Sequence, residues 1–423
     1  MKLIKTTLYS GFISFVRIIS GFISVKIVAS IIGPSGIAAV GAFSNFLSVI
    51  LTFSNGAINS GIIKYTAEYA SDESKKKLLF STATRITIIC SVICGIIIII
   101  FSSYISMLLF GHGDYYDVII CLGLSLLFYS LNSVLVSILN GLGKIGSYTI
   151  VNTAGAVFGL VLTLLLVHYL GVKGALYALI LSQALVFFTS ILFLLKEYWL
   201  KKEYLFSTID KDVSKNLFKY SSMAIVTALT VPVSQLFVRN YIIGEFGISD
   251  AGIWQGMMRL SDSYLTFVNM ALVTYYLPKL SSISDNSLLR KEIFRGYKLL
   301  VPVTALLCLC VYFTRTYIIE ILFTKDFLPM EHLFKWQILG DFFKICSYVL
   351  AFLMVAQAKT KFYIFTEILF SVSYIFLSML LSRLMGLEGT ALAFCLNYFG
   401  YLCLMIIYFR KLVFLKQEHN NGK

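Results

Sequence analysis

Residues 79–103, LFSTATRITIICSVICGIIIIIFSS, contain a single charged side chain, Arg85, in 25 positions. The hydrocarbon core of a bilayer is about 30 Å thick, and an α-helix of roughly 20 apolar residues crosses it. The stretch is therefore long and apolar enough to form a transmembrane helix.

Segments of the same kind recur along the whole chain. Of its 423 residues, 58% are hydrophobic and only 13% are charged, whereas a soluble domain is nearer half apolar and a quarter charged. The composition predicts an all-α polytopic membrane protein. We expect twelve transmembrane helices, near residues 6–31, 37–69, 79–103, 118–140, 147–170, 174–195, 216–243, 251–275, 299–322, 331–356, 362–381 and 390–410.

The basic residues predict the orientation of these helices, because Lys and Arg concentrate in cytoplasmic loops. With the N-terminus in the cytoplasm, the inner segments hold 22 Lys and Arg, and the outer ones hold four, Lys173, Arg315, Lys325 and Arg383. Both termini are therefore expected in the cytoplasm. The segment Met1–Ser10 leads into an apolar stretch without a small-residue cleavage site, so we expect the first helix to be retained.

Several classes of function are disfavoured. The net charge of +14 is explained by the inner loops and does not require a nucleic-acid partner. The chain lacks the G-x-x-x-x-G-K-[ST] nucleotide-binding motif, and its histidines are scattered, so we predict no cofactor and no metal site. The longest connections, 196–215 and 276–298, leave no room for a catalytic domain, and we predict no catalytic residues.

The two halves of the chain carry an internal repeat. Leu51-Thr-Phe-Ser-Asn55 returns as Leu265-Thr-Phe-Val-Asn269, and the same offset of 214 residues pairs Gly33 with Gly247. Because each half holds an even number of helices, both halves enter the membrane from the same side. This predicts two six-helix bundles related by a parallel pseudo-twofold axis, which is an architecture typical of transporters with a central cavity. The expected parts are an N-terminal bundle (1–200), a cytoplasmic linker (201–215), a C-terminal bundle (216–410) and a cytoplasmic tail (411–423).

Polar residues line one face of the second helix in each half. Asn45, Ser48, Thr52, Asn55 and Asn59 are spaced by three and four residues, and the matching helix has Arg259, Asp262, Thr266 and Asn269. Polar faces avoid lipid and point to the interior of a bundle. Hydrogen bonding between helices explains Ser48 and Thr52, whereas a cavity is favoured for Arg259 and Asp262.

Five basic residues lie deep within the expected spans: Arg17, Lys26, Arg239, Arg259 and Lys344. One such charge at the bilayer centre costs about 2.5–3.5 kcal/mol. The spacings Arg259/Asp262 and Asp341/Lys344 allow pairing along one helix face, whereas Arg17, Lys26 and Arg239 have no such local partner. A cavity with surplus positive charge favours an anionic substrate such as a phosphate. Asp262 and Asp341 are also candidates for carrying a proton or a cation.

Several motifs resemble those of a known family. They are Gly252-Ile-Trp-Gln-Gly256, Ser261-Asp-Ser-Tyr264 and Trp336-Gln-Ile-Leu-Gly-Asp341 with Lys344. Over essentially its whole length the chain resembles the Wzx-type flippases of lipid-linked oligosaccharides, in the multidrug/oligosaccharidyl-lipid/polysaccharide exporter superfamily. The nearest similarity is to the O-antigen and enterobacterial common antigen (lipid III) flippases.

The resemblance implies transport of an undecaprenyl-diphosphate oligosaccharide from the cytoplasmic to the periplasmic leaflet of a bacterial inner membrane. It also implies a polysaccharide polymerase and a chain-length regulator as partners. Such proteins carry cavity charges at positions matching Arg17, Lys26, Lys64, Arg239, Arg259, Asp262, Asp341 and Lys344. Together with Asn55 and Asn269, these residues other than Asp341 form the predicted substrate-binding cavity, and Asp262 and Asp341 are the candidates for ion coupling.

Three alternatives stay open. An ion-coupled multidrug antiporter of the same fold would need Asp262 or Asp341 as a titrating group. A glycan polymerase or ligase would act on the same lipid but usually needs a large outer loop. A major-facilitator transporter would carry a Gly/Asp/Arg loop pattern, which residues 70–78 lack.

Overall fold

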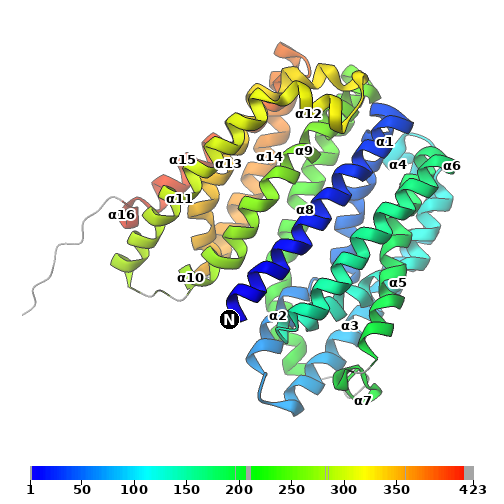
Figure 1. Ribbon diagram of the computed structural model, residues 1–423, viewed down its shortest axis with the longest axis vertical. Coiled ribbons are helices and arrows are strands. Elements are labelled where there is room, and N and C mark those ends of the chain that lie inside the picture. Colours follow the sequence, from blue (N-terminus) through cyan, green and yellow to red (C-terminus); the bar gives the residue numbers. More distant parts are fainter. Residues whose placement is uncertain are drawn as a thin grey trace, which may run out of the picture. The chain divides into compact units, whose positions relative to one another are not determined.

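The computed structural model describes residues 2–195, 197–205, 211–281, 283, 285–357 and 359–413, and all regular structure in these ranges is helical (Figure 1). The chain forms two compact units, residues 1–236 and 237–423. The first unit contains α1 (Lys2–Ser54), α2 (Asn59–Glu68), α3 (Glu73–Ile100), α4 (Ser102–Phe110), α5 (Tyr116–Gly141), α6 (Ile145–Leu194), the 3-10 turn η1 (Tyr198–Leu200) and α7 (Lys202–Leu205).

The long helix α8 (Lys211–Phe246) begins in the first unit and ends in the second. The second unit continues with α9 (Ile248–Ala271), the π-helix η2 (Leu272–Tyr276), α10 (Leu277–Ser281), α11 (Asn286–Phe313), α12 (Arg315–Leu322), the 3-10 segment η3 (Lys325–Met330), α13 (Glu331–Ala356), α14 (Thr360–Met385), α15 (Glu388–Tyr408) and α16 (Arg410–Val413).

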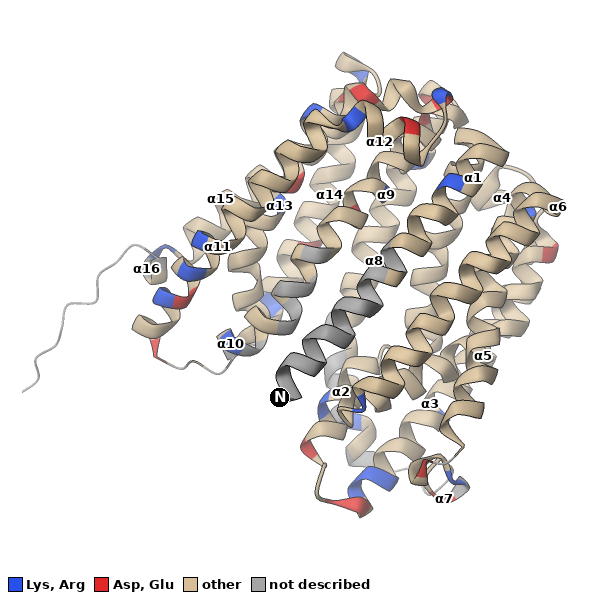
Figure 2. Ribbon diagram, in the orientation of Figure 1, with Lys and Arg blue, Asp and Glu red and all other residues tan. Residues whose placement is uncertain are grey.

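Eight helices in the described ranges are long and apolar enough to cross a membrane. Their outer faces expose large apolar side chains such as Ile100, Leu164 and Leu306. Lys, Arg, Asp and Glu lie mostly toward the helix ends (Figure 2). In water such surfaces would aggregate, whereas lipid accepts them, so the chain is a polytopic membrane protein.

Some predicted spans are interrupted. The expected helix 37–69 is wrong as a single element, because it breaks at residues 55–58 between α1 and α2. There Gly56 and Ala57 have φ of 61° and 55°, which no α-helix contains. The expected span 79–103 is also divided, since α3 ends at Ile100 and α4 begins at Ser102.

Two expected spans of the second unit change character before they end. The span 299–322 divides at Thr314, between α11 and α12. The next residue, Arg315, places its Nε 2.9 Å from Glu331 Oε1. The span 251–275 passes from α9 into the π-helix η2. By contrast, α13 has the predicted bounds, 331–356.

Four glycines mark sharp turns between long helical segments. Gly33 (φ 65°, ψ −165°) divides α1, Gly171 (φ 55°, ψ −128°) divides α6, and Gly247 (φ 97°, ψ 169°) separates α8 from α9. Gly386 (φ 64°, ψ −149°) lies between α14 and α15. Residues with a Cβ adopt this backbone region only with strain. All four turns are therefore glycine-dependent.

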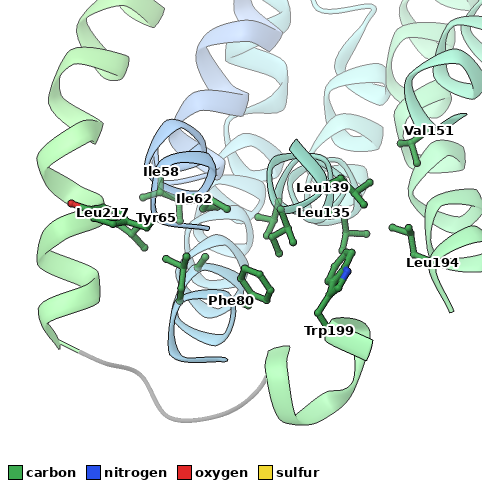
Figure 3. Close-up of a cluster of buried hydrophobic side chains, with 14 of the residues drawn as sticks. Ile58, Ile62, Tyr65, Phe80, Leu135, Leu139, Val151, Leu194, Trp199 and Leu217 are labelled. Atoms are coloured by element: carbon green, nitrogen blue, oxygen red, sulfur yellow. The ribbon is translucent and has the colours of Figure 1, made fainter. Parts of the chain in front are cut away.

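The segment after α6 is anchored to the first unit. Trp199 is fully buried, and its ring meets Phe80 edge-on with centroids 6.1 Å apart. Figure 3 shows the Trp199 ring projecting toward Leu135 and Leu139 of α5. An ion pair between Lys144 and Glu197 holds the start of this segment. Residues 197–199 thus pack against the rest of the first unit.

Candidate functional site in the second unit

The candidate site forms where α9 and α13 pack together, and small residues allow the close approach of the helices around it. A Cβ added at Gly256 of α9 would lie 3.2 Å from the Phe323 ring. A Cβ at Gly340 of α13 would lie 2.4 Å from the Phe394 ring and 3.0 Å from the Cys395 backbone of α15. Larger residues would push these helices apart. The glycines therefore fix the positions of the polar residues next to them.

Asp341 is the most deeply buried acidic residue of the site, with no exposed surface. Ser261 Oγ donates to Asp341 Oδ1 over 2.6 Å, and the Tyr264 hydroxyl donates to Oδ2. Gln337 Nε2 lies 3.5 Å from both Asp341 Oδ1 and Ser261 Oγ. A buried carboxylate is stable only when hydrogen-bond donors surround it. Two helices supply these donors here.

Lys344 lies one turn beyond Asp341 on α13 and forms an ion pair with Asp262 of α9. Its Nζ is 3.6 Å from Asp262 Oδ1. The ammonium also faces the rings of Phe394 and Tyr398 of α15, at 5.8 Å and 5.6 Å from their centroids. The Lys344 side chain is 12% exposed and that of Asp262 is 66% exposed. The pair therefore presents mainly its carboxylate to the surroundings.

Two predicted arginines belong to the same unit. Arg239 of α8 is 2% exposed and donates from Nη2 to Asn240 Oδ1 over 3.0 Å. Arg259 is partly buried on α9, one turn before Asp262. Asn269, also partly buried, lies near the end of α9.

The other predicted site residues lie in the first unit. Lys26 is partly buried in α1, and the side chain of Arg17 lies outside the described residues. Asn55 is 4% exposed in the turn that follows α1. Lys64 of α2 has a 48% exposed side chain, with its Nζ 3.9 Å from Glu68 Oε2 and 4.9 Å from the centroid of the Tyr65 ring. Lys64 thus occupies a half-exposed position in the middle of the short helix α2.

The polar stripe predicted on residues 45–59 does not continue along one helix. Ser48 and Thr52 donate to the carbonyls of Ser44 and Ser48, one turn earlier in α1. Beyond the break, Asn59 Nδ2 donates to Ser133 Oγ of α5 over 2.8 Å. These two hydroxyls and the Asn59 amide nitrogen thus have hydrogen-bond partners within the first unit, whereas the buried Asn59 Oδ1 has none among the described residues.

Sequence reasoning did not assign roles to Ser261, Tyr264 and Gln337. A signal was present, because Ser261 and Tyr264 are three residues apart on α9, and Gln337 and Asp341 are four apart on α13. Such spacings place polar groups on one helix face. The polar faces of these two helices therefore predict a buried hydrogen-bond network between them.

Two solved transporters share the fold of this chain. An inward-facing multidrug resistance MATE family transporter of the MOP superfamily superposes with a TM-score of 0.78, at 14% identity, over 94% of this chain and 98% of that chain. The lipid II flippase MurJ in an inward closed conformation superposes with a TM-score of 0.75, at 18% identity, over 96% of this chain and 87% of that chain. The fold is that of MOP-superfamily transporters.

The chain belongs to the polysaccharide biosynthesis protein family, whose sequence profile matches residues 27–332. It is also 27% identical over 405 residues to proteins named lipid III flippase from Escherichia coli (strain K12) and Shigella flexneri. The match covers 96% of this chain and 97% of each relative. The resemblance to oligosaccharide flippases in the sequence is thereby confirmed.

Proposed function

We propose that this protein is a flippase that moves an undecaprenyl-diphosphate-linked oligosaccharide from the cytoplasmic to the periplasmic leaflet of the bacterial inner membrane. The observation that carries the proposal is the similarity of almost the whole chain to proteins named lipid III flippase, which are transporters and not enzymes. The fold alone does not select the cargo, because flippases and multidrug transporters share it.

The proposed topology has twelve spans. The eight apolar helices include Ile19–Ser54 and Ile145–Leu194, each divided by a glycine turn, so they supply ten spans. Adding α8 and α9 gives twelve. The 22 to 4 distribution of Lys and Arg supports cytoplasmic termini.

The glycine turns support the parallel repeat and the division into bundles 1–200 and 216–410, joined by the linker 201–215 and followed by the tail 411–423. Gly33 and Gly247 are 214 residues apart, Gly171 and Gly386 are 215 apart, and all four share a positive φ. The second glycines of Gly171-Val-Lys-Gly174 and Gly386-Leu-Glu-Gly389 also match. A Cβ there would lie 1.8 Å and 2.2 Å from the carbonyl oxygens of Leu166 and Leu381. Chance does not readily produce such paired backbone constraints.

Within this architecture, the diphosphate and glycan cross through a polar cavity while the polyprenyl tail stays in lipid. Moving the charged head group through hydrocarbon is prohibitive without partners. Lys26, Arg239 and Arg259 supply the positive charge for the diphosphate, and Arg17, Lys64, Asn55 and Asn269 are further members of the cavity. Because Arg239 is buried in this structure, its contribution requires a conformation in which α8 has moved.

Asp262 and Lys344 have different roles in the proposed site. The exposed carboxylate of Asp262 accepts hydrogen bonds from sugar hydroxyl or amide N–H groups, whereas the shielded Lys344 orients it. Neutral parts of the glycan are thus bound next to the cations that bind its diphosphate.

Asp341 is the proposed ion-coupling residue. It is fully buried and bonded by neutral donors, so gaining a proton or a cation would change the packing between α9 and α13. Asp262 is the second candidate, although its ion pair with Lys344 already satisfies it in part. Coupling through either residue would drive the change between inward-open and outward-open conformations.

The product of flipping defines the proposed partners. An oligosaccharide unit that reaches the outer leaflet is the substrate of a polysaccharide polymerase, and a chain-length regulator acts on the polymer. We therefore propose both as functional partners of this chain in the inner membrane.

Reconstitution tests the function directly. Purified protein in vesicles should make an undecaprenyl-diphosphate oligosaccharide accessible on the opposite leaflet faster than protein-free vesicles do, and Arg259→Ala should slow this step. Lys75→Ala is the matched control, because Lys75 is a half-exposed cation outside the cavity. No movement above protein-free vesicles, with native glycan and an ion gradient supplied, would reject the flippase and favour the antiporter.

A further inference from the structure

The second long helix of each half is irregular at neighbouring positions of the repeat. In the first unit, the motif Leu51–Asn55 ends in the turn 55–58. In the second, the matching motif Leu265–Asn269 is followed by the π-helix Leu272–Tyr276. The offset of 214 residues maps the turn 55–58 onto residues 269–272. Interruptions and π-segments in long helices often mark functional positions.

The turn 55–58 of the first unit is a strained connection. Gly56 and Ala57 both have positive φ, and Ala57 is the one residue other than glycine with positive φ in the described ranges. A Cβ added at Gly56 would lie 3.0 Å from Ile86 of α3. A side chain with a Cβ in this conformation persists only where the surroundings impose it.

Both sides of the turn are tied to the same neighbouring helix, α5. Before the turn, Ser54 Oγ and Ser130 Oγ are 2.7 Å apart. After the turn, Asn59 Nδ2 donates to Ser133 Oγ over 2.8 Å. Ser54 and Ser130 form a buried hydroxyl pair, whereas Asn59 and Ser133 are only partly buried. The Asn59–Ser133 bond is therefore more accessible than the Ser54–Ser130 pair, although Ile58 of the turn and Ile62 of α2 still pack on α5 in a buried apolar cluster.

The first part of α8 contacts both the turn 55–58 and α2. Ser221 Oγ donates to the Gly56 carbonyl over 3.1 Å. Leu217 packs so closely on α2 that a Cβ at Gly61 would lie 2.9 Å from its Cδ2. Figure 3 shows Leu217 beside Tyr65 of α2. Because α8 continues through Pro232 into the second unit, it mechanically connects this turn to that unit.

We infer that the turn 55–58 is a hinge at which α2 swings away from α5 when α8 moves. The inference rests on the proposed function, because the swing belongs to its transport cycle. Bending at the turn requires rotation of a few already irregular backbone positions, whereas bending a continuous helix would break several hydrogen bonds. The π-helix Leu272–Tyr276 is the corresponding flexible point of the second unit. There the Tyr276 hydroxyl donates to the Val349 carbonyl over 3.2 Å.

Two cysteine pairs, one on each side of the turn, test the hinge. They are introduced into a variant in which alanine replaces the eight native cysteines. Ser54→Cys with Ser130→Cys ties the helix before the turn to α5, and Asn59→Cys with Ser133→Cys ties the helix after it. Each pair is joined by oxidation or by the shortest bifunctional methanethiosulfonate, and joining is verified by mass spectrometry.

With the hinge as inferred, joining the 59/133 pair lowers flipping at least about tenfold and reduction restores it, whereas joining the 54/130 pair leaves the rate within about twofold. Normal flipping by the fully joined 59/133 pair would overturn the hinge. An equal loss of flipping in both joined pairs would also overturn the hinge, because any cross-link to α5 would then slow transport.

The reduced variants separate the two hypotheses. If the reduced proteins do not flip lipid, the proposed function fails. The hinge is then tested by maleimide labelling of the single variant Asn59→Cys. Its thiol reacts with maleimide only if α2 transiently separates from α5. Constant protection of Cys at position 59, next to a labelled exposed control at Lys64→Cys, would reject the hinge independently of transport.

Discussion

Lys344 holds its ammonium 3.6 Å from the Asp262 carboxylate, yet the lysine side chain is 12% exposed and the aspartate side chain 66% exposed. The two members of this ion pair are therefore not equivalent. Removing Asp262 leaves the shielded Lys344 ammonium without its carboxylate partner, next to aromatic rings. Removing Lys344 leaves the Asp262 carboxylate, which is exposed and can be solvated. We expect Asp262→Ala to destabilise the protein by about 1–3 kcal/mol, and Lys344→Met to do so by less.

Thermal unfolding of the detergent-purified protein measures this asymmetry, and the double variant Asp262→Ala/Lys344→Met should lose less stability than the sum of the two single losses. Equal losses in both single variants would contradict the unequal shielding. Lys344→Met should nevertheless impair flipping, because Asp262 loses the group that orients it.

Tyr264 and Ser261 should stabilise the buried Asp341 carboxylate. Tyr264→Phe removes one donor while keeping the ring, so we expect a loss of about 1–2 kcal/mol in the free energy of unfolding.

Asp341→Asn tests the proposed ion coupling. Its flipping rate should no longer change when the proton or sodium gradient is collapsed, whereas the wild-type rate should fall. An unchanged gradient response in Asp341→Asn would exclude Asp341 as the coupling residue.

Gly340 should tolerate no side chain. Gly340→Ala places a Cβ 2.4 Å from Phe394 and 3.0 Å from the Cys395 backbone, so we expect a loss of about 1–3 kcal/mol. Gly244→Ala in α8 is the control, because nothing lies within 4 Å of its added Cβ, and alanine should stabilise that helix by about 0.4–1 kcal/mol. Similar melting temperatures for the two variants would refute the tight α13–α15 contact.

Trp199 should be essential for the anchored segment 197–205. Trp199→Ala empties a fully buried position beside Phe80, and we expect a loss of about 3–5 kcal/mol. Limited proteolysis should then cut between residues 197 and 205, where the wild type resists. Trp199→Phe retains an aromatic ring and should remain largely resistant, and rapid cleavage of the wild type itself would show that this segment is not anchored.

Asp285 should contribute to stability in a pH-dependent way. It caps α11, and hydrogen bonds from the Ser287 hydroxyl and from the backbone N–H groups of Leu288 and Ser287 lower the pKa of its carboxyl. A carboxyl with a lowered pKa stabilises the fold above its unfolded value of about 3.9, and this contribution is lost as the pH falls through the lowered folded value.

The wild type should therefore lose more thermal stability than Asp285→Asn between about pH 5 and pH 2, since the amide can still cap the helix but does not titrate. Parallel stability profiles of the two proteins over this range would contradict the assignment.

The sequence predicts long helices well where an apolar run is bounded by clear stops. The bounds of α13 agree with the prediction because its apolar run lies between Pro329 and Gln357. Prediction from the sequence fails where a helix breaks inside an apolar stretch. At residues 55–58 the polar spacing predicts one continuous helix face, although the Asn55-Gly56 pair is a local turn signal. At Thr314 the break is followed by Arg315, and hydropathy cannot identify its ion-pair partner Glu331.

The candidate site was predictable in part for the same reason. Spacing along one helix identified Asp262, Asp341 and Lys344 as members of polar faces. It could not reveal that Lys344 bonds Asp262 on another helix or that Asp341 is bonded by Ser261 and Tyr264, because these contacts depend on how α9 and α13 are placed side by side.

The sharing of α8 between the units has a consequence for biosynthesis. Leu217 and Ser221 complete the packing around Gly61 and Gly56, although the ribosome makes them after all other helices of the first unit. That unit cannot mature in the bilayer as soon as its other helices have emerged from the translocon. It must wait, partly open, for the next segment of nascent chain. A ribosome stalled shortly before residue 217 should leave an N-terminal intermediate that proteases and membrane chaperones still recognise as unfinished.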